Sequence, residues 1–259
     1  MSDFEPALCT VTFRKMPADA IVRLAVNARL AAIEWAGDTH VPPGDGPTAR
    51  HVARLCERAG LATSYGSYVT PPTDDLSAFM RALDTAIALG ASNIRIWPGT
   101  RQRDSEDYNA DERRAAADAI RDMGAEAVRH GVTVSLEYHP QSLTDDTQSA
   151  RRLIEAIAHD NVYLYWQPRP GLELDEALAE VGELGEHVSH VHVFAWDADR
   201  NRFPLKSASE YWRTVLSAMP ASRWSGRRFA MLEFVANDDP AAFFEDAATL
   251  RQILNGENR

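Results

Sequence analysis

The chain has 259 residues, 45% of them hydrophobic and 25% charged, which suits a soluble protein with a well-filled core. Its formal net charge of −11 would repel a phosphate backbone, so nucleic acid is not an expected partner. No basic segment precedes a long apolar run at the N-terminus, and we expect neither a signal peptide nor a membrane span. Cys9 and Cys56 are too few for a disulfide framework and too far apart for a zinc or redox motif. A cytoplasmic location is therefore expected.

Short apolar or β-branched runs alternate with amphipathic helical stretches along the chain. The predicted strands cover residues 8–13, 31–35, 62–69, 93–97, 132–138, 162–167, 190–194 and 229–235. Clear helical patterns cover residues 17–30, 74–90, 111–131 and 240–254. Gly90 and Gly131 close two of these patterns, as is typical of helix C-termini.

The number of strands predicts the fold class, which is α/β. Eight strand and helix pairs at about 32 residues each correspond to a closed (β/α)8 barrel, or TIM barrel. We expect one domain over residues 1–259. The alternative is an open doubly wound sheet, which usually has a glycine-rich phosphate turn after its first strand. That place holds TFRKMPAD here, so the barrel is favoured.

Polar side chains stand at the ends of the last four predicted strands. They are Glu137, Gln167, His192 and Glu233. Strand ends converge on one mouth of a barrel, and two carboxylates, an imidazole and an amide oxygen can together hold a divalent cation. The sequence therefore predicts a metal site.

An ion-pair network is the competing interpretation of the same residues. A single Glu at a strand end commonly pairs with an arginine, and a single His is commonly a hydrogen-bonded core residue. Arg95 and Arg228 are the cations that would make such pairs. Burying two acids among apolar neighbours is costly unless cations or donors compensate them, which favours metal ligation for the set as a whole.

These strand ends resemble the xylose-isomerase-like TIM barrels, a superfamily of sugar isomerases, epimerases and related enzymes. The resemblance is carried by IEWAGDTHVPPGD, SLEYHPQSLTDD, LYWQP, HVHVFAWD and MLEFV. It implies a divalent ion (Mn, Mg or Co) bound by Glu137, His192 and Glu233. Gln167 stands where the family usually has Asp, and the PRPG that follows lacks a His common in the epimerases. A Gln carbonyl oxygen can still coordinate a cation.

The resemblance implies an isomerase, either a ketose epimerase or an aldose–ketose isomerase, acting on a sugar or sugar phosphate. Proton transfer would pass through an enediolate, with Glu137 and Glu233 as the acid/base pair. Two alternatives stay open. One is a dehydratase of a cyclic polyol on the same scaffold. The other is a metal-free sugar-binding barrel, which is considered because Gln167 replaces the usual Asp.

Further residues are expected to bind a small sugar or polyol. They are Glu34, His40, Trp97, His139, Trp196 and Arg200. Aromatic faces stack on the apolar face of a sugar, and acids, histidines and cations bind its oxygens. The alternatives are core packing for the tryptophans and solvent-facing loop positions for His139 and Arg200. Apolar residues on outer helices, as in AAFFEDAA, suggest a homo-oligomer.

Overall fold

The computed structural model describes residues 3–256 and contains eight strands and eight α-helices in that range. The strands are β1 (Phe4–Cys9), β2 (Ala32–Ala36), β3 (Ala62–Gly66), β4 (Asn93–Ile96), β5 (Thr133–Glu137), β6 (Val162–Trp166), β7 (Val188–Val193) and β8 (Arg228–Leu232). The α-helices are α1 (Ala18–Asn27), α2 (Gly46–Ala59), α3 (Leu76–Leu89), α4 (Ala110–Val128), α5 (Thr147–Ile157), α6 (Leu174–Leu184), α7 (Ser209–Ala218) and α8 (Pro240–Asn255). Short 3-10 helices are η1 (Thr10–Phe13), η2 (Ser105–Asp107), η3 (Gly185–His187), η4 (Leu205–Ala208) and η5 (Ala236–Asp238).

The strands form a closed barrel in the order β1 to β8. Closure comes from parallel pairing of β1 with β8, in which Phe4 to Leu8 lie opposite Arg228 to Leu232. A closed sheet has no edge strand, unlike the open doubly wound alternative. The predicted (β/α)8 barrel is therefore confirmed.

Two compact units make up the described chain. One comprises residues 3–34, 55–62 and 166–256, and includes β1, β7, β8 and most of β2. The other comprises residues 35–54 and 63–165, and includes β4, β5 and most of β3 and β6. A single domain over residues 1–259 stays a prediction, and residues 1, 2 and 257–259 lie outside the described part.

The first strand differs from the sequence prediction. It begins at Phe4 and ends at Cys9, whereas residues 10–13 form η1. Pro6 has no N–H to donate to a neighbouring strand, but its carbonyl accepts from Ala31 N at 2.7 Å. The β-branched run that favoured a strand over residues 8–13 instead turns back toward α8, where the Phe13 and Phe243 rings lie 5.5 Å apart. Cys9 is consequently the last residue of β1.

The clear helical patterns all form helices. Gly90 is the C-cap of α3 with φ of 73°, a conformation that glycine adopts without strain. The prediction for Gly131 is wrong in detail, because α4 ends at Val128 with Arg129 as its C-cap. Gly131 lies in the following turn, where its N–H donates to the Val128 carbonyl at 3.1 Å.

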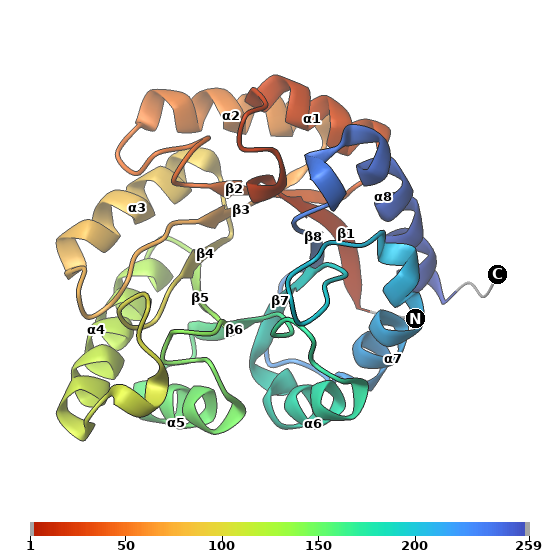
Figure 1. Ribbon diagram of the computed structural model, residues 1–259. Coiled ribbons are helices and arrows are strands. Elements are labelled where there is room, and N and C mark those ends of the chain that lie inside the picture. The colour runs from red at the N-terminus through yellow and green to blue at the C-terminus, as the bar shows by residue number, and fades with distance from the viewer. Residues whose placement is uncertain (1–2, 257–259) are drawn as a thin grey trace. The chain divides into compact units, whose positions relative to one another are not determined.

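Helix α8 packs beside β1 and β8 (Figure 1). Asp239 caps its N-terminus by accepting from Ala241 N, and Pro240 takes the first helical position, where no N–H is needed. Phe243 is fully buried, while the adjacent Phe244 is 36% exposed. None of the helices between residues 3 and 256 combines the length and apolar composition that crossing a bilayer requires.

Asp246 of α8 holds the loop that follows β7. Its side chain is 4% exposed and its Oδ1 accepts from Leu205 N, at the start of η4, at 2.7 Å. Burial raises the pKa of Asp246 to about 6. A single buried carboxylate therefore links an outer helix to the segment between β7 and α7.

This carboxylate predicts a pH dependence of stability. Between the unfolded pKa of about 3.9 and the folded pKa of about 6, the folded protein binds more protons than the unfolded protein. The contribution of Asp246 is therefore most favourable below about pH 4 and is lost as the pH rises through about 6. We expect Asp246→Asn, which keeps an acceptor oxygen, to raise the free energy of unfolding at pH 8 by on the order of 2 kcal/mol and to change it little near pH 4.

Urea unfolding between pH 4.5 and pH 8 measures this effect. Asp84→Asn, which makes the same chemical change at an exposed aspartate of α3, is the matched control. Identical pH profiles for wild type and Asp246→Asn would contradict the assignment.

Candidate active site

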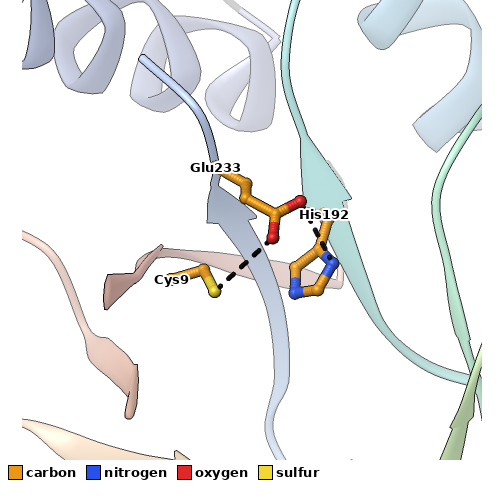
Figure 2. A group of neighbouring side chains, drawn as sticks. All are labelled: Cys9, His192 and Glu233. Atoms are coloured by element: carbon orange, nitrogen blue, oxygen red, sulfur yellow. Dashed lines mark hydrogen bonds and ion pairs between the residues drawn. The ribbon is translucent and has the colours of Figure 1, made fainter. Parts of the chain in front are cut away.

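Three buried side chains from β1, β7 and the residue after β8 come together in the first unit (Figure 2). They are Cys9, His192 and Glu233, and one ligand atom of each lies within 4.8 Å of the others. The Cys9 thiol lies 3.8 Å from Glu233 Oε1, and His192 Nδ1 lies 3.5 Å from Glu233 Oε2. Sulfur, nitrogen and oxygen donors therefore share one small volume.

The register of the sheet explains this convergence. Cys9 lies directly opposite Glu34 on β2. Leu8 lies opposite Leu232 on β8, so Cys9 and Glu233 continue the same register one residue further. His192 lies opposite Met231, and Glu233 is two residues beyond Met231, on the same face of the sheet. Strand periodicity thus turns all four side chains to one side.

Glu34 and Gln167 extend the cluster. Cys9 Sγ donates to Glu34 Oε1 at 3.3 Å, and His192 Nε2 lies 3.5 Å from the same oxygen. His192 Nδ1 lies 2.9 Å from Gln167 Oε1. Glu34 is fully buried and Glu233 is 5% exposed, so His192 stands between two buried carboxylates.

The donor set fits a divalent cation. Ligands at about 2.0 to 2.3 Å from a tetrahedral ion lie about 3.3 to 3.8 Å apart. Glu34 Oε1 lies 3.3 Å from Cys9 Sγ and 3.5 Å from His192 Nε2, and Cys9 Sγ lies 3.8 Å from Glu233 Oε1. Burying two carboxylates carries a desolvation cost that a bound cation can offset. A thiolate with an imidazole and a carboxylate favours zinc or cobalt over magnesium.

His190, two residues before His192, is a core histidine. Burial lowers the pKa of His190 to about 3, so it is neutral. Its Nδ1 accepts from Phe229 N at 3.0 Å, and its ring stacks on that of Phe229 at 5.2 Å. His190 therefore serves the packing of the barrel, whereas His192 has ring nitrogens 3.5 Å from carboxylate oxygens of the cluster.

In the second unit, Glu137 forms an ion pair with Arg95. Both side chains are buried, at 6% and 2% exposure, and the Arg95 guanidinium also lies 5.9 Å from the centre of the Tyr165 ring. This is the pairing that the ion-pair interpretation anticipated for Arg95. Arg228, the other suggested cation, instead donates to the Val188 carbonyl at 3.1 Å.

The other predicted substrate-binding residues lie on loops after the strands. Trp97 and His139 form one pair, with ring centres 4.1 Å apart, and both are half-buried. Trp196 lies between Phe194 and Phe234, at 4.7 and 5.0 Å.

His40 and Arg200 are placed differently. The His40 ring meets Trp35 edge-on at 5.9 Å. Arg200 is exposed in a turn with φ of 64°, where its N–H donates to the Asp197 carbonyl. Their substrate roles stay predictions.

Cys9 is the member of the cluster that sequence reasoning missed. The sequence was searched for disulfide frameworks and short metal motifs, in which cysteines lie close together along the chain. Cys9 belongs to no such pattern. The signal in the sequence was its position at the end of the first strand, and the wrong bounds of that strand concealed it. Glu34 was predicted to bind substrate, and the structure brings it against Cys9 and His192.

The family model described as "Xylose isomerase-like TIM barrel" matches residues 22–253. The chain belongs to this family. Comparison with curated proteins finds no match. Members of the xylose isomerase-like family carry out more than one reaction, so the family alone does not fix the activity.

Solved structures similar to this chain include different enzymes. One is "the probable 3-DHS dehydratase AsbF involved in the petrobactin synthesis" from Bacillus anthracis, with 18% identity, TM-score 0.76 and coverage of 96% of this chain and 99% of that one. A xylose isomerase-like protein from Mycobacterium smegmatis in complex with magnesium has 16% identity, TM-score 0.70 and full coverage of both chains. A D-allulose 3-epimerase from Methylomonas sp. has 12% identity, TM-score 0.66 and coverage of 100% and 99%. At these identities the likeness shows the fold alone.

The thiol predicts the metal preference of the site. We expect Cys9→Ser to weaken Zn²⁺ binding by about tenfold or more and to change Mg²⁺ binding little, because Mg²⁺ prefers oxygen ligands. Titration calorimetry measures both affinities, and a cobalt–thiolate absorption band should disappear in the variant. Cys56→Ser, which changes the other buried cysteine, is the control. Equal Zn²⁺ affinity in wild type and Cys9→Ser would rule out coordination by sulfur.

The Arg95–Glu137 pair predicts strong coupling in stability. We expect Arg95→Met to lower the free energy of unfolding by about 3 to 5 kcal/mol, because the buried Glu137 loses a compensating cation. The double variant Arg95→Met/Glu137→Gln should recover part of this loss. A double-mutant cycle by urea unfolding measures the coupling, and additive effects would contradict it.

Proposed function

We propose that this protein is a metal-dependent isomerase of a sugar or sugar phosphate, working by proton transfer through an enediolate. The observation that carries the proposal is Glu233 beside the Cys9 thiol and His192, all buried at the ends of barrel strands. In this fold, side chains at strand ends carry the chemistry. We further propose a cytoplasmic enzyme with a small-molecule substrate and no nucleic-acid or membrane partner.

Cys9, His192 and Glu233 would hold the metal ion, with Glu34 and Gln167 next to them. When bound, a divalent ion would polarise a carbonyl and hydroxyl pair and stabilise the negative charge of an enediolate. Gln167 Oε1 accepts a hydrogen bond from His192 Nδ1 at 2.9 Å, which fixes the orientation of the imidazole. This orientation does not require the Asp that the family usually has at that position.

Glu233 is the acid/base group in this proposal. Its two carboxylate oxygens face different neighbours, Oε1 toward Cys9 and Oε2 toward His192, so one oxygen can bind while the other exchanges a proton. Trp196, in contact with Phe194 and Phe234, gives an aromatic surface for the apolar face of a sugar ring. The buried setting excludes water from the proton transfer.

The ion pair of Glu137 distinguishes between kinds of isomerase. Epimerisation at one carbon needs proton removal from one face and proton return on the other, which requires two groups. Aldose–ketose isomerisation moves a proton between neighbouring carbons on one face, which one group can do. Arg95 holds Glu137 through a guanidinium that stays charged, so Glu137 must release it to exchange protons. Proton transfer by Glu233 alone is therefore favoured over a two-carboxylate epimerase.

A dehydratase is the second candidate, and the same observation supports it. Elimination of water on one face can use one group, which removes a proton from carbon and returns it to the departing hydroxyl. The similar structure from Bacillus anthracis is described as a probable dehydratase. An isomer and an unsaturated product differ in ultraviolet absorption, which makes the two candidates separable.

Hydrogen exchange in deuterated water tests the proposal. With Zn²⁺, Co²⁺, Mn²⁺ or Mg²⁺ added, we expect deuterium to enter carbon next to the carbonyl of an aldose, ketose or corresponding phosphate, measured by mass spectrometry. Glu233→Gln should lower the rate by about 10² to 10⁴-fold, with metal content measured on the same samples. Glu137→Gln should reduce it much less if one group suffices.

The products decide among the alternatives. A deuterated aldose–ketose pair supports the isomerase, an inverted centre supports the epimerase, and an absorbing unsaturated product supports the dehydratase. Absence of exchange over the whole panel, with metal bound, would count against proton transfer and favour a sugar-binding barrel.

A further inference from the structure

A second feature of the first unit is a cavity of about 650 Å³ beside η1. Its wall consists of residues 11–17, Arg202, Phe234, Asn237 and Asp238. This volume lies within the range of small-molecule pockets. The wall includes none of the residues of the metal cluster, so the cavity needs its own explanation.

The cavity is built on the same strands as the cluster. The segment 11–17 follows Cys9 of β1, and Phe234 follows Glu233 directly. Arg202 stands in the segment after β7, the strand that carries His192. Each loop of the wall therefore begins at a strand bearing one member of the cluster. The residues of the cluster and the wall of the cavity are therefore neighbours along the chain at three strand ends.

The charge of the wall is opposite to that of the whole chain. It contains three cations, Arg14, Lys15 and Arg202, and one carboxylate, Asp238. Asp238 is already paired with Arg202 Nη1 at 2.8 Å. The chain as a whole has a formal net charge of −11, so the wall differs in sign from the chain as a whole. Its excess of positive charge would attract an anion rather than a neutral molecule.

Thr12 supplies a second, independent observation. It lines the cavity and is only 1% exposed, and within residues 3–256 its Oγ1 has no hydrogen-bond partner. Buried hydroxyl groups normally have a partner. A ligand oxygen in the cavity would provide one.

The residues after β8 hold the wall in an uncommon backbone conformation. Phe234, Asn237 and Asp238 have φ values of 52°, 58° and 52°, in the left-handed region that residues other than glycine rarely adopt. The Arg202 guanidinium lies 4.9 Å from the centre of the Phe234 ring. Such strained segments concentrate at ligand-binding sites, and this one positions Arg202.

We propose that this cavity binds the anionic end of an acidic substrate, a carboxylate or a phosphate, through Lys15, Arg14, Arg202 and the Thr12 hydroxyl. The inference rests on the proposed function, since it assigns the substrate class of the same site. The substrate is then a sugar acid or sugar phosphate whose carbonyl end meets Glu233 and His192, and whose charged end lies in the cavity. Neutral sugars lack the group that the wall recognises.

The two lysines of the chain, Lys15 and Lys206, allow a direct test within one molecule. Both are exposed, but only Lys15 lines the cavity. Acetylation by an N-hydroxysuccinimide ester is followed by mass spectrometry with inorganic phosphate, D-gluconate or uncharged sorbitol. We expect phosphate or gluconate to slow acetylation of Lys15 by about fivefold or more, with Lys206 unchanged and sorbitol without effect.

The pattern of protection identifies the anion. Protection by phosphate alone supports a sugar phosphate, and protection by gluconate supports a carboxylate. Equal protection of both lysines, protection by sorbitol, or no protection of Lys15 overturns the proposal.

Variants separate binding from folding. Lys15→Met should weaken binding of the protecting anion by about tenfold, whereas Lys206→Met should leave it unchanged. Thr12→Val should also weaken binding but should leave the melting temperature unchanged or higher, because it removes a buried hydroxyl that lacks a partner. A purely structural role for Thr12 would change stability and not anion affinity, which contradicts the proposal.

Metal content and hydrogen exchange of the same variants separate the two hypotheses. Retained metal binding and exchange on neutral sugars, with no effect of Lys15→Met on anions, would overturn the anion site alone. Anion binding without any exchange on charged or neutral substrates would instead contradict the proposed isomerase.

Discussion

The burial of Glu34 and Glu233 on either side of His192 is the constraint on which the rest of the site depends. Two carboxylates removed from water carry a desolvation penalty, and an imidazole and a thiol lie against them. The closed barrel imposes this arrangement, because the register of β1 with β2 and β8 turns the three strand ends to one side. A cation held by Cys9, His192 and Glu233 would offset the penalty, which is why the cluster points to a metal.

The second unit stabilises a buried acid in a different way. Glu137 has Arg95 as an internal cation, and both are almost fully buried. Within this pair, the guanidinium balances the charge of the carboxylate. Glu233 of the first unit instead lies against the Cys9 thiol and the His192 ring. In the proposed mechanism, this contrast gives the two glutamates different roles. Glu233 faces groups that can exchange protons or bind metal, and Glu137 faces a guanidinium that can do neither. This difference carries the preference for proton transfer by one carboxylate.

The proposed reacting residues and the proposed anion-binding residues lie on the same strand ends and the loops that follow them. β1, β7 and the end of β8 carry Cys9, His192 and Glu233, and the loops that follow them carry Thr12, Lys15, Arg202 and Phe234. Strands fix the reacting groups rigidly, while loops can vary without disturbing the barrel. The local positive charge in a chain of net charge −11 is the basis of the anion selectivity that we propose for the site. Similarity of fold at 12 to 18% identity does not establish a function, so the proposed function rests on these residues.

The sequence by itself determined the barrel and the candidate positions at the strand ends. Alternation of short apolar runs with helical patterns is a local property, and so is the place of Gln167, His192 and Glu233 at or near the last residue of a strand. Only the tertiary structure decided which groups meet. The sequence treated Cys9 as interior to a strand and Arg95 as one of two arginines that could pair with the acids. Strand register brings Cys9 opposite Glu34 and selects Arg95 for Glu137. Strand pairing joins residues far apart in the chain, so the pattern along one strand does not identify the residue that lies opposite on its neighbour.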